Sequence, residues 1–241
     1  MAEPFLSIVV PAYNEAGRIR DTLKRLCHFK ELEPYSIELV VVDDGSTDQT
    51  AETVSEFPGI RLVRNDRNHG KGFTVRHGVL KARGEFVLFT DADLSTPIEE
   101  TDKLLSALQS SGADAAIGSR ALKRELIGIR QPLFRDMAGR FFNLLVRVFT
   151  GLRLHDTQCG FKLFQRRSTR RAFELTRVEG FGFDPELLFL IERIGGRVVE
   201  VPVRWNDNPA TKVRFLRDST RMFLDLIAIR WRAFTGKYNA P

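Results

Sequence analysis

The segment EFVLFTDADLSTP, residues 85–97, begins as an apolar strand and ends in two aspartates, Asp91 and Asp93, separated by one alanine. Two carboxylates this close repel each other unless a positive group lies near them. A pair of carboxylates at a strand end suits Mg²⁺ or Mn²⁺, which often combine one or two carboxylates with substrate phosphates. The alternative is helix capping, because Asp near a helix start is common and stabilising.

The helix expected after this segment has its own start signals. Thr96 and Glu99 have the spacing of a capping box, and Pro97 occupies the expected first helical position. We therefore expect Thr96 to cap this helix, which leaves Asp91 and Asp93 available for a metal ion.

The rest of the chain repeats the pattern of a strand followed by a helix. Apolar, β-rich runs occur at residues 6–10, 37–42, 60–64, 85–90 and 114–119, and helix-period segments at 15–29, 48–56, 71–82 and 97–111. This alternation predicts an α/β fold, a mostly parallel sheet with helices on both faces. Further along, we expect helices over 120–153, short strands around a helix at 185–194 within 160–203, and a final amphipathic helix over 213–233.

Polar residues follow four of the predicted strands. They are Pro11 to Glu15, Asp43 to Ser46, Asp91 to Asp93, and Gly118 to Arg120. Ligands of open parallel sheets bind beyond the carboxyl ends of the strands, so these residues are predicted to converge at one edge. Turn formation explains Gly45 and Ser46, but it does not require two aspartates straight after an apolar run.

Other candidate residues have two interpretations each. Gly70-Lys71-Gly72 precedes a helix and suggests phosphate contact through backbone N–H groups, or only a loop glycine. Asp184 lies with Glu186 at a predicted helix start, where capping explains one acid. Lys212 follows a loop and is either a phosphate contact or a solvated lysine. The patterns GxxxxGK[ST] and GxGxxG do not occur, which argues against an ATPase loop and a dinucleotide oxidoreductase.

Composition and charge limit the classes of protein to which this chain can belong. The 241 residues, 43% hydrophobic, suit one large domain that buries a core without disulfides. Cys27 and Cys159 lack CxxC spacing, so we expect reduced thiols and a cytosolic type of environment. No basic leader precedes the first strand, and no run reaches the roughly 20 apolar residues that span a bilayer. The net charge of +6 indicates an anionic partner, namely phosphate, nucleic acid or a lipid surface.

Basic residues gather in two segments that are also rich in large apolar residues, 120–153 and 204–237. We expect helices over 133–149 and 213–233 to rest in a membrane interface, with core packing as the alternative. The apolar residues concerned are Phe134, Phe141, Phe142, Leu145 and Phe149 in the first helix, and Phe215, Leu216, Phe223, Leu226, Ile227 and Trp231 in the second.

The motifs SIVVPAYNE, VVDDGSTD, TDADLSTP and GSR, in this order, resemble the family 2 glycosyltransferases with the GT-A fold. DTQCGFKLF, FDPELLFL and the basic C-terminal helix are similar to the dolichyl-phosphate β-glucosyltransferase branch, whose acceptors are polyprenyl phosphates. The resemblance covers nearly the whole chain. It implies a single domain over residues 1–241, with a nucleotide-sugar half up to about residue 120 and an acceptor and membrane-facing half over 121–241.

The resemblance implies inverting transfer of glucose from UDP-glucose to a dolichyl or other polyprenyl phosphate, by a metal-dependent hexosyltransferase. It assigns Pro11, Tyr13, Glu15, Val42 and Asp44 to the nucleotide, Asp91, Ala92 and Asp93 to a Mg²⁺ or Mn²⁺ and diphosphate site, and Arg120 and Lys212 to phosphates. We expect Arg135 to relieve repulsion between donor and acceptor and Asp184 to orient the acceptor or the sugar. The expected location is cytoplasmic, peripheral to the cytoplasmic face of a membrane.

Two alternatives stay open. One is a GDP-mannose-dependent polyprenyl-phosphate mannosyltransferase, although such enzymes carry an arginine where Asn206 stands here. The other is a non-catalytic nucleic-acid binder, suggested by the positive charge. Against nucleic acid, the basic residues lie among large aliphatic residues, and no RNA-binding signature occurs.

Overall fold

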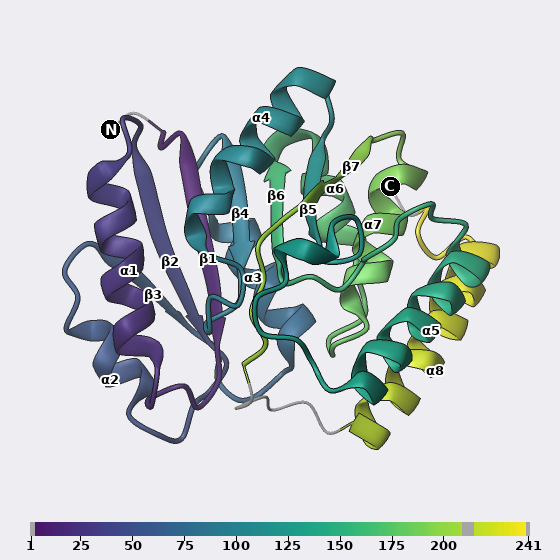
Figure 1. Ribbon diagram of the computed structural model, residues 1–241, viewed down its shortest axis with the longest axis horizontal. Coiled ribbons are helices and arrows are strands. Elements are labelled where there is room, and N and C mark those ends of the chain that lie inside the picture. The colour runs from purple at the N-terminus through teal and green to yellow at the C-terminus, as the bar shows by residue number, and fades with distance from the viewer. Residues whose placement is uncertain (1–2, 209–214, 240–241) are drawn as a thin grey trace.

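The computed structural model describes residues 3–208 and 215–239, in which one seven-stranded sheet has helices on both faces (Figure 1). The strands are β1 (Leu6–Ala12), β2 (Ile37–Asp43), β3 (Ile60–Arg64), β4 (Phe86–Thr90), β5 (Ala115–Ser119), β6 (Phe161–Gln165) and β7 (Val198–Pro202). Their order is β3-β2-β1-β4-β6-β5-β7. Only β6 among these strands runs antiparallel to its neighbours, which confirms the predicted mostly parallel sheet.

The helices follow the predicted segments, with one addition. They are α1 (Ile19–Leu32), α2 (Thr50–Ser55), α3 (Lys71–Lys81), α4 (Thr101–Ser111), α5 (Leu133–Thr150), α6 (Arg166–Leu175), α7 (Phe183–Arg193) and α8 (Phe215–Phe234), with 3-10 turns η1 (Ile98–Glu100) and η2 (Arg124–Leu126). Helix α6 lies where only short strands and a later helix were predicted. Its buried residues Thr169, Ala172 and Phe173 have helical spacing, a signal that the many arginines of this short segment obscure.

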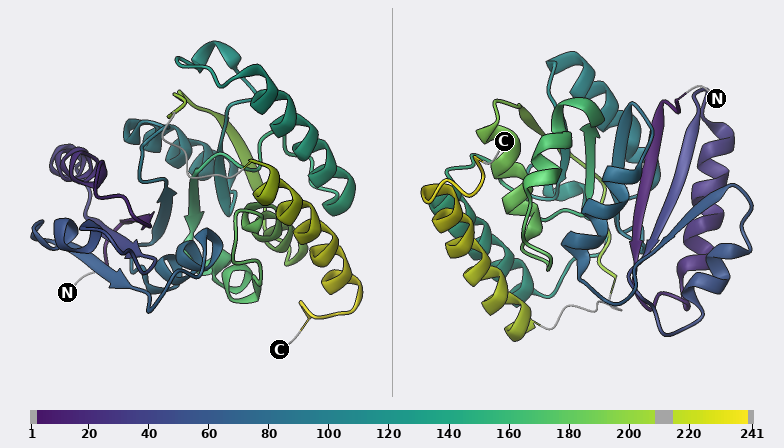
Figure 2. Two further views of the ribbon diagram at one scale, coloured as in Figure 1. Left: turned by 90° about the horizontal axis from the view of Figure 1, so that it is seen from below. Right: turned by 180° about the vertical axis from the view of Figure 1, so that it is seen from behind.

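Two apolar layers cover the sheet because successive strand residues point to opposite faces. Leu6, Ile8 and Val10 pack with α1 and α4 on one face, and Val9 packs with α3 on the other. The second layer also receives α5, α6, α7 and α8. Helices α5 and α8 lie side by side, away from α1 and α2 (Figure 1, Figure 2). Among the described residues, no helix has both the length and the hydropathy of a membrane-spanning segment.

Helix α3 lies unusually close to the sheet, which positions Lys71 at its first turn. A Cβ on Gly78 would stand 2.5 Å from Val9 Cγ1 and 2.7 Å from Val42 Cγ2. Only glycine therefore allows the helix to reach this depth over β1 and β2, and the N-terminal end of α3 is fixed above the carboxyl ends of those strands.

The predicted capping box at Thr96 is wrong. Pro97, rather than Thr96, is the N-cap of η1, with extended backbone angles (φ −57°, ψ 140°) and no side-chain capping bond. The Thr96 side chain is buried instead, with its hydroxyl 3.7 Å from the Cys159 sulfur. Capping by Thr96 therefore does not explain why Asp91 and Asp93 are available for a metal ion.

Candidate functional site

A cleft of about 840 Å³ lies at the carboxyl ends of β1, β2 and β4. It brings together a set of residues predicted from the sequence, namely Pro11, Tyr13, Glu15, Asp44, Lys71, Asp91, Ala92 and Asp93. Three of the four predicted strand ends therefore converge. The fourth, at Arg120 after β5, does not contribute to the described lining of this cleft.

The two aspartates of the opening segment have positive neighbours from the chain itself. Lys71 Nζ lies 2.7 Å from Asp91 Oδ1, and Arg18 Nη1 lies 3.8 Å from Asp93 Oδ2. Arg18 also forms a short ion pair with Glu15. Asp93 Oδ1 additionally accepts a hydrogen bond of 3.0 Å from the Ser95 N–H, so Asp93 shapes the turn after β4 as well.

The turn around Asp93 contains a backbone conformation that residues other than glycine rarely adopt. Leu94 has a φ of +46°, in the left-handed region. The Thr22 hydroxyl of α1 donates to the Ala92 carbonyl at 2.6 Å and fixes the preceding peptide. Such strained residues gather at functional sites, where the surrounding structure has to maintain them.

The seat of Asp91 depends on a glycine from the second half of the chain. The Asp91 N–H donates to the Gly160 carbonyl at 3.1 Å, just before β6. A Cβ on Gly160 would overlap the Asp91 carboxylate, so no other residue allows this approach. The glycine of the DTQCGFKLF motif thus places the carboxylate of the TDADLSTP motif.

Asp91 and Asp93 supply a hard, all-oxygen donor pair. The described residues contain no group of three or more His, Cys, Asp or Glu side chains arranged to hold a metal ion. Mg²⁺ and Mn²⁺ do not need such a cage, because they accept one or two carboxylates and complete their shell with water and substrate phosphates. The donor set fits a cation whose coordination shell is completed by a substrate, and not a cation whose ligands all come from the protein.

Asp44 organises the loop between β3 and α3. Its carboxylate accepts hydrogen bonds from Asn65 Nδ2 at 2.7 Å, the His69 N–H at 3.1 Å and the Gly70 N–H at 2.8 Å. The Gly72 N–H in turn donates to the Glu179 carbonyl at 2.7 Å. The Gly70 and Gly72 N–H groups therefore already have protein acceptors, and phosphate contact through the backbone of Gly70-Lys71-Gly72 stays a prediction.

The Lys71 side chain, in contrast, lies in the cleft. Burial alone would lower its pKa, but the carboxylates of Asp91 and Asp184 outweigh burial and raise the pKa above its ordinary value. Its ammonium group also lies 5.4 Å from the centre of the Phe89 ring. Lys71 is therefore a protonated cation at neutral pH.

A second, buried ion pair lies behind this first one. Lys162 of β6 is fully buried, and its Nζ lies 2.6 Å from Asp184 Oδ1. Burial raises the pKa of Asp184, opposed by the charges of Lys162 and Lys71. Asp184 does not line the cleft, and it influences the site through its charge, which helps to raise the pKa of Lys71. No sequence motif marks Lys162, whose only signal is a single lysine inside the apolar run FKLF.

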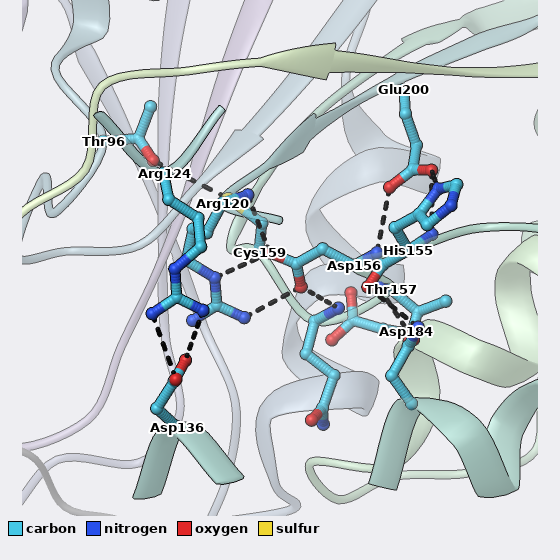
Figure 3. Close-up of polar contacts among 12 residues, drawn as sticks. Thr96, Arg120, Arg124, Asp136, His155, Asp156, Thr157, Cys159, Asp184 and Glu200 are labelled. Atoms are coloured by element: carbon cyan, nitrogen blue, oxygen red, sulfur yellow. Dashed lines mark hydrogen bonds and ion pairs between the residues drawn. The ribbon is translucent and has the colours of Figure 1, made fainter. Parts of the chain in front are cut away.

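The arginines predicted to contact phosphate are held elsewhere. Arg120 forms a two-pronged ion pair with Asp156, at 2.7 Å and 2.8 Å (Figure 3). Its guanidinium carbon lies 5.3 Å from the centre of the Trp205 ring. Arg135 Nη1 lies 3.9 Å from Asp207 Oδ2. Neither lines the cleft.

The two remaining predicted residues do not add to the lining either. Val42 is fully buried in the apolar layer under α3. Lys212 lies outside the described residues. For Arg120, Arg135, Val42 and Lys212, contact with substrate stays a prediction.

Several lining residues were not predicted. They are Arg18 just before α1, the loop residues Arg67, Asn68 and His69, the residues Glu179 and Gly180 before α7, and Arg217, Asp218, Arg221 and Met222 of α8. No local motif marks them, because they reach the cleft from helices and loops that are distant in the sequence. The part of α8 before Phe223 therefore belongs to the site.

With this geometry in place, comparison with known proteins identifies the family. The Glycosyl transferase family 2 model matches residues 7–173. This chain belongs to glycosyl transferase family 2. A dolichyl-phosphate beta-glucosyltransferase of Saccharomyces cerevisiae is 36% identical over 98% of this chain and 77% of its own length. The human protein of the same name is 35% identical over 97% of this chain and 77% of its own length.

Solved structures support the fold assignment. A Mycobacterium tuberculosis glucosyl-3-phosphoglycerate synthase in complex with Mn²⁺, UDP and glucosyl-3-phosphoglycerate aligns with a TM-score of 0.67 and 21% identity, covering 99% of this chain and 81% of that one. Mannosyl-3-phosphoglycerate synthase from Rubrobacter xylanophilus aligns with a TM-score of 0.73 and 19% identity, covering 96% and 75%. The GT-A fold expected for the family 2 glycosyltransferases is confirmed.

The Arg120–Asp156 pair yields a prediction about stability and pH. Burial would raise the pKa of Asp156, but Arg120 lowers it to about 2. A carboxyl group whose pKa is lower in the folded than in the unfolded protein stabilises the fold at pH values above its unfolded pKa. This stabilisation is lost as the pH falls from about 4 to about 2. We expect Asp156→Asn to lower the free energy of unfolding by about 2 kcal/mol at pH 7 and by about half as much at pH 3.

Urea unfolding of the wild type and Asp156→Asn at both pH values measures this difference. Asp21→Asn, which changes an exposed aspartate on α1, is the control and should have little effect at either pH. A loss for Asp156→Asn that is equally large at pH 3 would contradict the assigned ion pair.

Proposed function

We propose that this protein transfers glucose from UDP-glucose to a dolichyl or other polyprenyl phosphate, with inversion at the anomeric carbon. The observation that carries the proposal is the carboxylate pair Asp91 and Asp93 in a cleft whose volume, about 840 Å³, suits a nucleotide sugar. The relatives at 35% and 36% identity are dolichyl-phosphate beta-glucosyltransferases, which supports this donor and this acceptor class.

The donor would lie along the carboxyl ends of the strands. Pro11, Tyr13, Glu15 and Asp44 line the part of the cleft that suits the base and ribose, and Asp91 to Asp93 the part that suits the diphosphate. A Mg²⁺ or Mn²⁺ ion on Asp91 and Asp93 would neutralise charge that builds up on the departing UDP. The protonated Lys71, already 2.7 Å from Asp91, adds a second positive charge at the same end.

In the transfer step, an oxygen of the acceptor phosphate forms a bond to the anomeric carbon on the face opposite UDP. The bond from that carbon to the UDP oxygen breaks, and UDP leaves with the electron pair, so the product is β-linked. A phosphate monoester has a second pKa of about 6 and is already ionised, so the step needs little help from a general base. Asp184 is paired with Lys162 and does not line the cleft, so no base is assigned to it, and its expected role in orienting the acceptor or the sugar stays a prediction.

The apolar residues of α5 and α8 divide between core and surface. The side chains exposed on α5 are Leu133, Phe134, Met137, Phe141, Leu144 and Val148, and those on α8 are Phe223, Leu224, Ile227, Trp231 and Phe234. Phe142 and Leu226 are buried, and Leu145 and Phe149 pack against the core. The core alternative is therefore right for these four residues. The predicted outward position is found for Phe134, Phe141, Phe223, Ile227 and Trp231, while the side chains of Phe215 and Leu216 lie outside the description.

We infer that the exposed faces of α5 and α8 rest in the interface of a membrane, on its cytoplasmic face. The two helices lie side by side, so their exposed apolar residues can meet one surface (Figure 2). Exposed arginines, including Arg147 and Arg230, accompany them. A basic, apolar surface of this kind is attracted to anionic lipids, by about 1 kcal/mol for each basic residue near the membrane.

The catalytic proposal predicts that Asp93→Asn strongly slows glucose transfer. We expect glucose transfer from UDP-glucose to a short polyprenyl phosphate, with Mg²⁺ or Mn²⁺ present, to fall by roughly 100-fold or more, as when a charge-stabilising group leaves an active site. Asp102→Asn, at an exposed position on α4, should keep wild-type turnover. Near wild-type turnover of Asp93→Asn would refute the role of the carboxylate pair, and faster wild-type transfer from GDP-mannose would favour the mannosyl alternative.

The membrane proposal predicts that charge on the exposed faces weakens binding to lipid. Vesicles with anionic lipid at low salt should co-sediment with the wild type, and the variant Phe141→Glu/Trp231→Glu should bind roughly tenfold less because two apolar contacts become charged. Leu32→Glu, which changes a side chain 69% exposed on α1, is the control and should bind like the wild type. If all three proteins bind the vesicles equally, or if none of them binds, the assignment of the membrane-binding surface is wrong.

A further inference from the structure

Helix α8 joins the cleft to the exposed apolar surface. Arg217 and Arg221, both exposed, line the cleft and are four residues apart, so they lie on the same face of the helix. Arg221 Nε lies 3.8 Å from the position that a Cβ would take on Gly180, which also lines the cleft. The Arg221 side chain therefore runs along the loop before α7 at the wall of the cleft.

Two other cations of the cleft lining are already matched by carboxylates, and a third, Arg67, lies beside Gly45 after β2, where the nucleotide is expected. Lys71 faces Asp91, and Arg18 faces Glu15 and Asp93. Outside the cleft lining, Arg120 and Arg135 have Asp156 and Asp207 as partners. These groups neutralise the acidic end of the site, where a donor diphosphate is expected, so charge for a second anion must come from another place.

The acids beside the α8 arginines compensate them only in part. Asp218 lines the cleft between them. Asp225 lies one turn beyond Arg221, whose charge opposes the rise that burial causes in the Asp225 pKa. Asp225 Oδ2 is buried and has no hydrogen-bond partner among the described atoms, so Arg221 is not bonded to that oxygen. Arg221 thus remains positioned to meet an anion in the cleft.

The same helix continues into an apolar surface. Phe223, Leu224, Ile227, Trp231 and Phe234 follow the arginines and are exposed. At about 1.5 Å per residue, the helix from Arg217 to Phe234 is about 25 Å long. An anionic head followed by a long apolar chain matches this order, whereas a small soluble phosphate would use the arginines alone.

We propose that Arg217 and Arg221 bind the phosphate of the acceptor and that the exposed face of α8 from Phe223 to Phe234 receives its apolar chain. This inference rests on the proposed function, because it locates the second substrate of that reaction. It assigns the acceptor phosphate to α8, and not to Arg120 and Arg135, whose guanidinium groups are engaged by Asp156 and Asp207.

The test compares Arg217→Gln/Arg221→Gln with the wild type in transfer from saturating UDP-glucose to a polyprenyl phosphate. We expect the acceptor KM to rise at least tenfold, while the Kd of UDP-glucose, measured by calorimetry, stays within about twofold. Arg217→Lys/Arg221→Lys should recover part of the acceptor affinity because the charge is kept. Arg167→Gln, an exposed arginine on α6 and absent from the described cleft lining, is the control and should keep the wild-type acceptor KM.

A second arm separates the lipid phosphate from a free phosphate. Trp231→Ala should raise the KM for a long polyprenyl phosphate and leave that for a two-isoprene phosphate unchanged. Glycerol 3-phosphate should be a poor acceptor for every variant. If it serves the wild type as well as the lipid does, the assignment of the apolar chain to α8 is wrong.

The outcomes distinguish this inference from the proposed function. If the wild type transfers no glucose to any polyprenyl phosphate, the proposed function fails, and the inference with it. If the wild type is active and the glutamine variant keeps the wild-type acceptor KM, the inference is overturned while the function stands. A parallel loss of UDP-glucose affinity would assign the arginines to the donor and would also overturn the inference. Should the glutamine variant not fold, the lysine variant decides by the same KM and Kd measurements.

Discussion

The contact between Lys71 and Asp91 is the interaction on which the site depends. Two carboxylates at the end of β4 repel each other, and the fold supplies a cation from the first turn of α3 at 2.7 Å. Both partners are placed by glycines at which an added Cβ would meet a neighbouring side chain at less than 3 Å. Gly78 lets α3 lie against β1 and β2, and Gly160 lets the Asp91 carboxylate lie against the chain before β6.

Charges alternate from the interior outward through this contact. Lys162 and Asp184 form a buried pair, Lys71 lies within the influence of Asp184, and Asp91 follows at the cleft. A buried ion pair is rarely a net source of stability, because desolvation opposes the attraction, but removing one partner is costly. Lys162 and Asp184 therefore fix β6 and α7 relative to the cleft and help to keep Lys71 protonated. The cation of a substrate diphosphate can then compete with Lys71 for the Asp91 carboxylate, while the surrounding residues keep their positions.

The local parts of this site could be predicted from the sequence, and the distant parts could not. The strand ends at Tyr13, Asp44 and Asp91 follow apolar runs, and the rule for parallel sheets brings them to one edge. The capping box at Thr96 failed because the hydroxyl turns to Cys159, a residue more than 60 positions away. The segment Gly70-Lys71-Gly72 before a helix suggested backbone contact with phosphate, but Asp44 and Glu179 already accept the hydrogen bonds of the Gly70 and Gly72 amides. Arg217 and Arg221 carry no motif at all, because only packing brings α8 to the cleft.

The central claim is that the carboxylates beside Lys71 hold a nucleotide sugar through a divalent cation. The most direct measurement is calorimetric titration of the wild-type protein with UDP-glucose, in Mn²⁺ and again after chelation of the metal. Because two carboxylates and a diphosphate repel one another without a cation, affinity should fall at least tenfold on chelation. An unchanged affinity would contradict the claim, and it would mean that Lys71 and Arg18 alone balance the charge of Asp91, Asp93 and the donor.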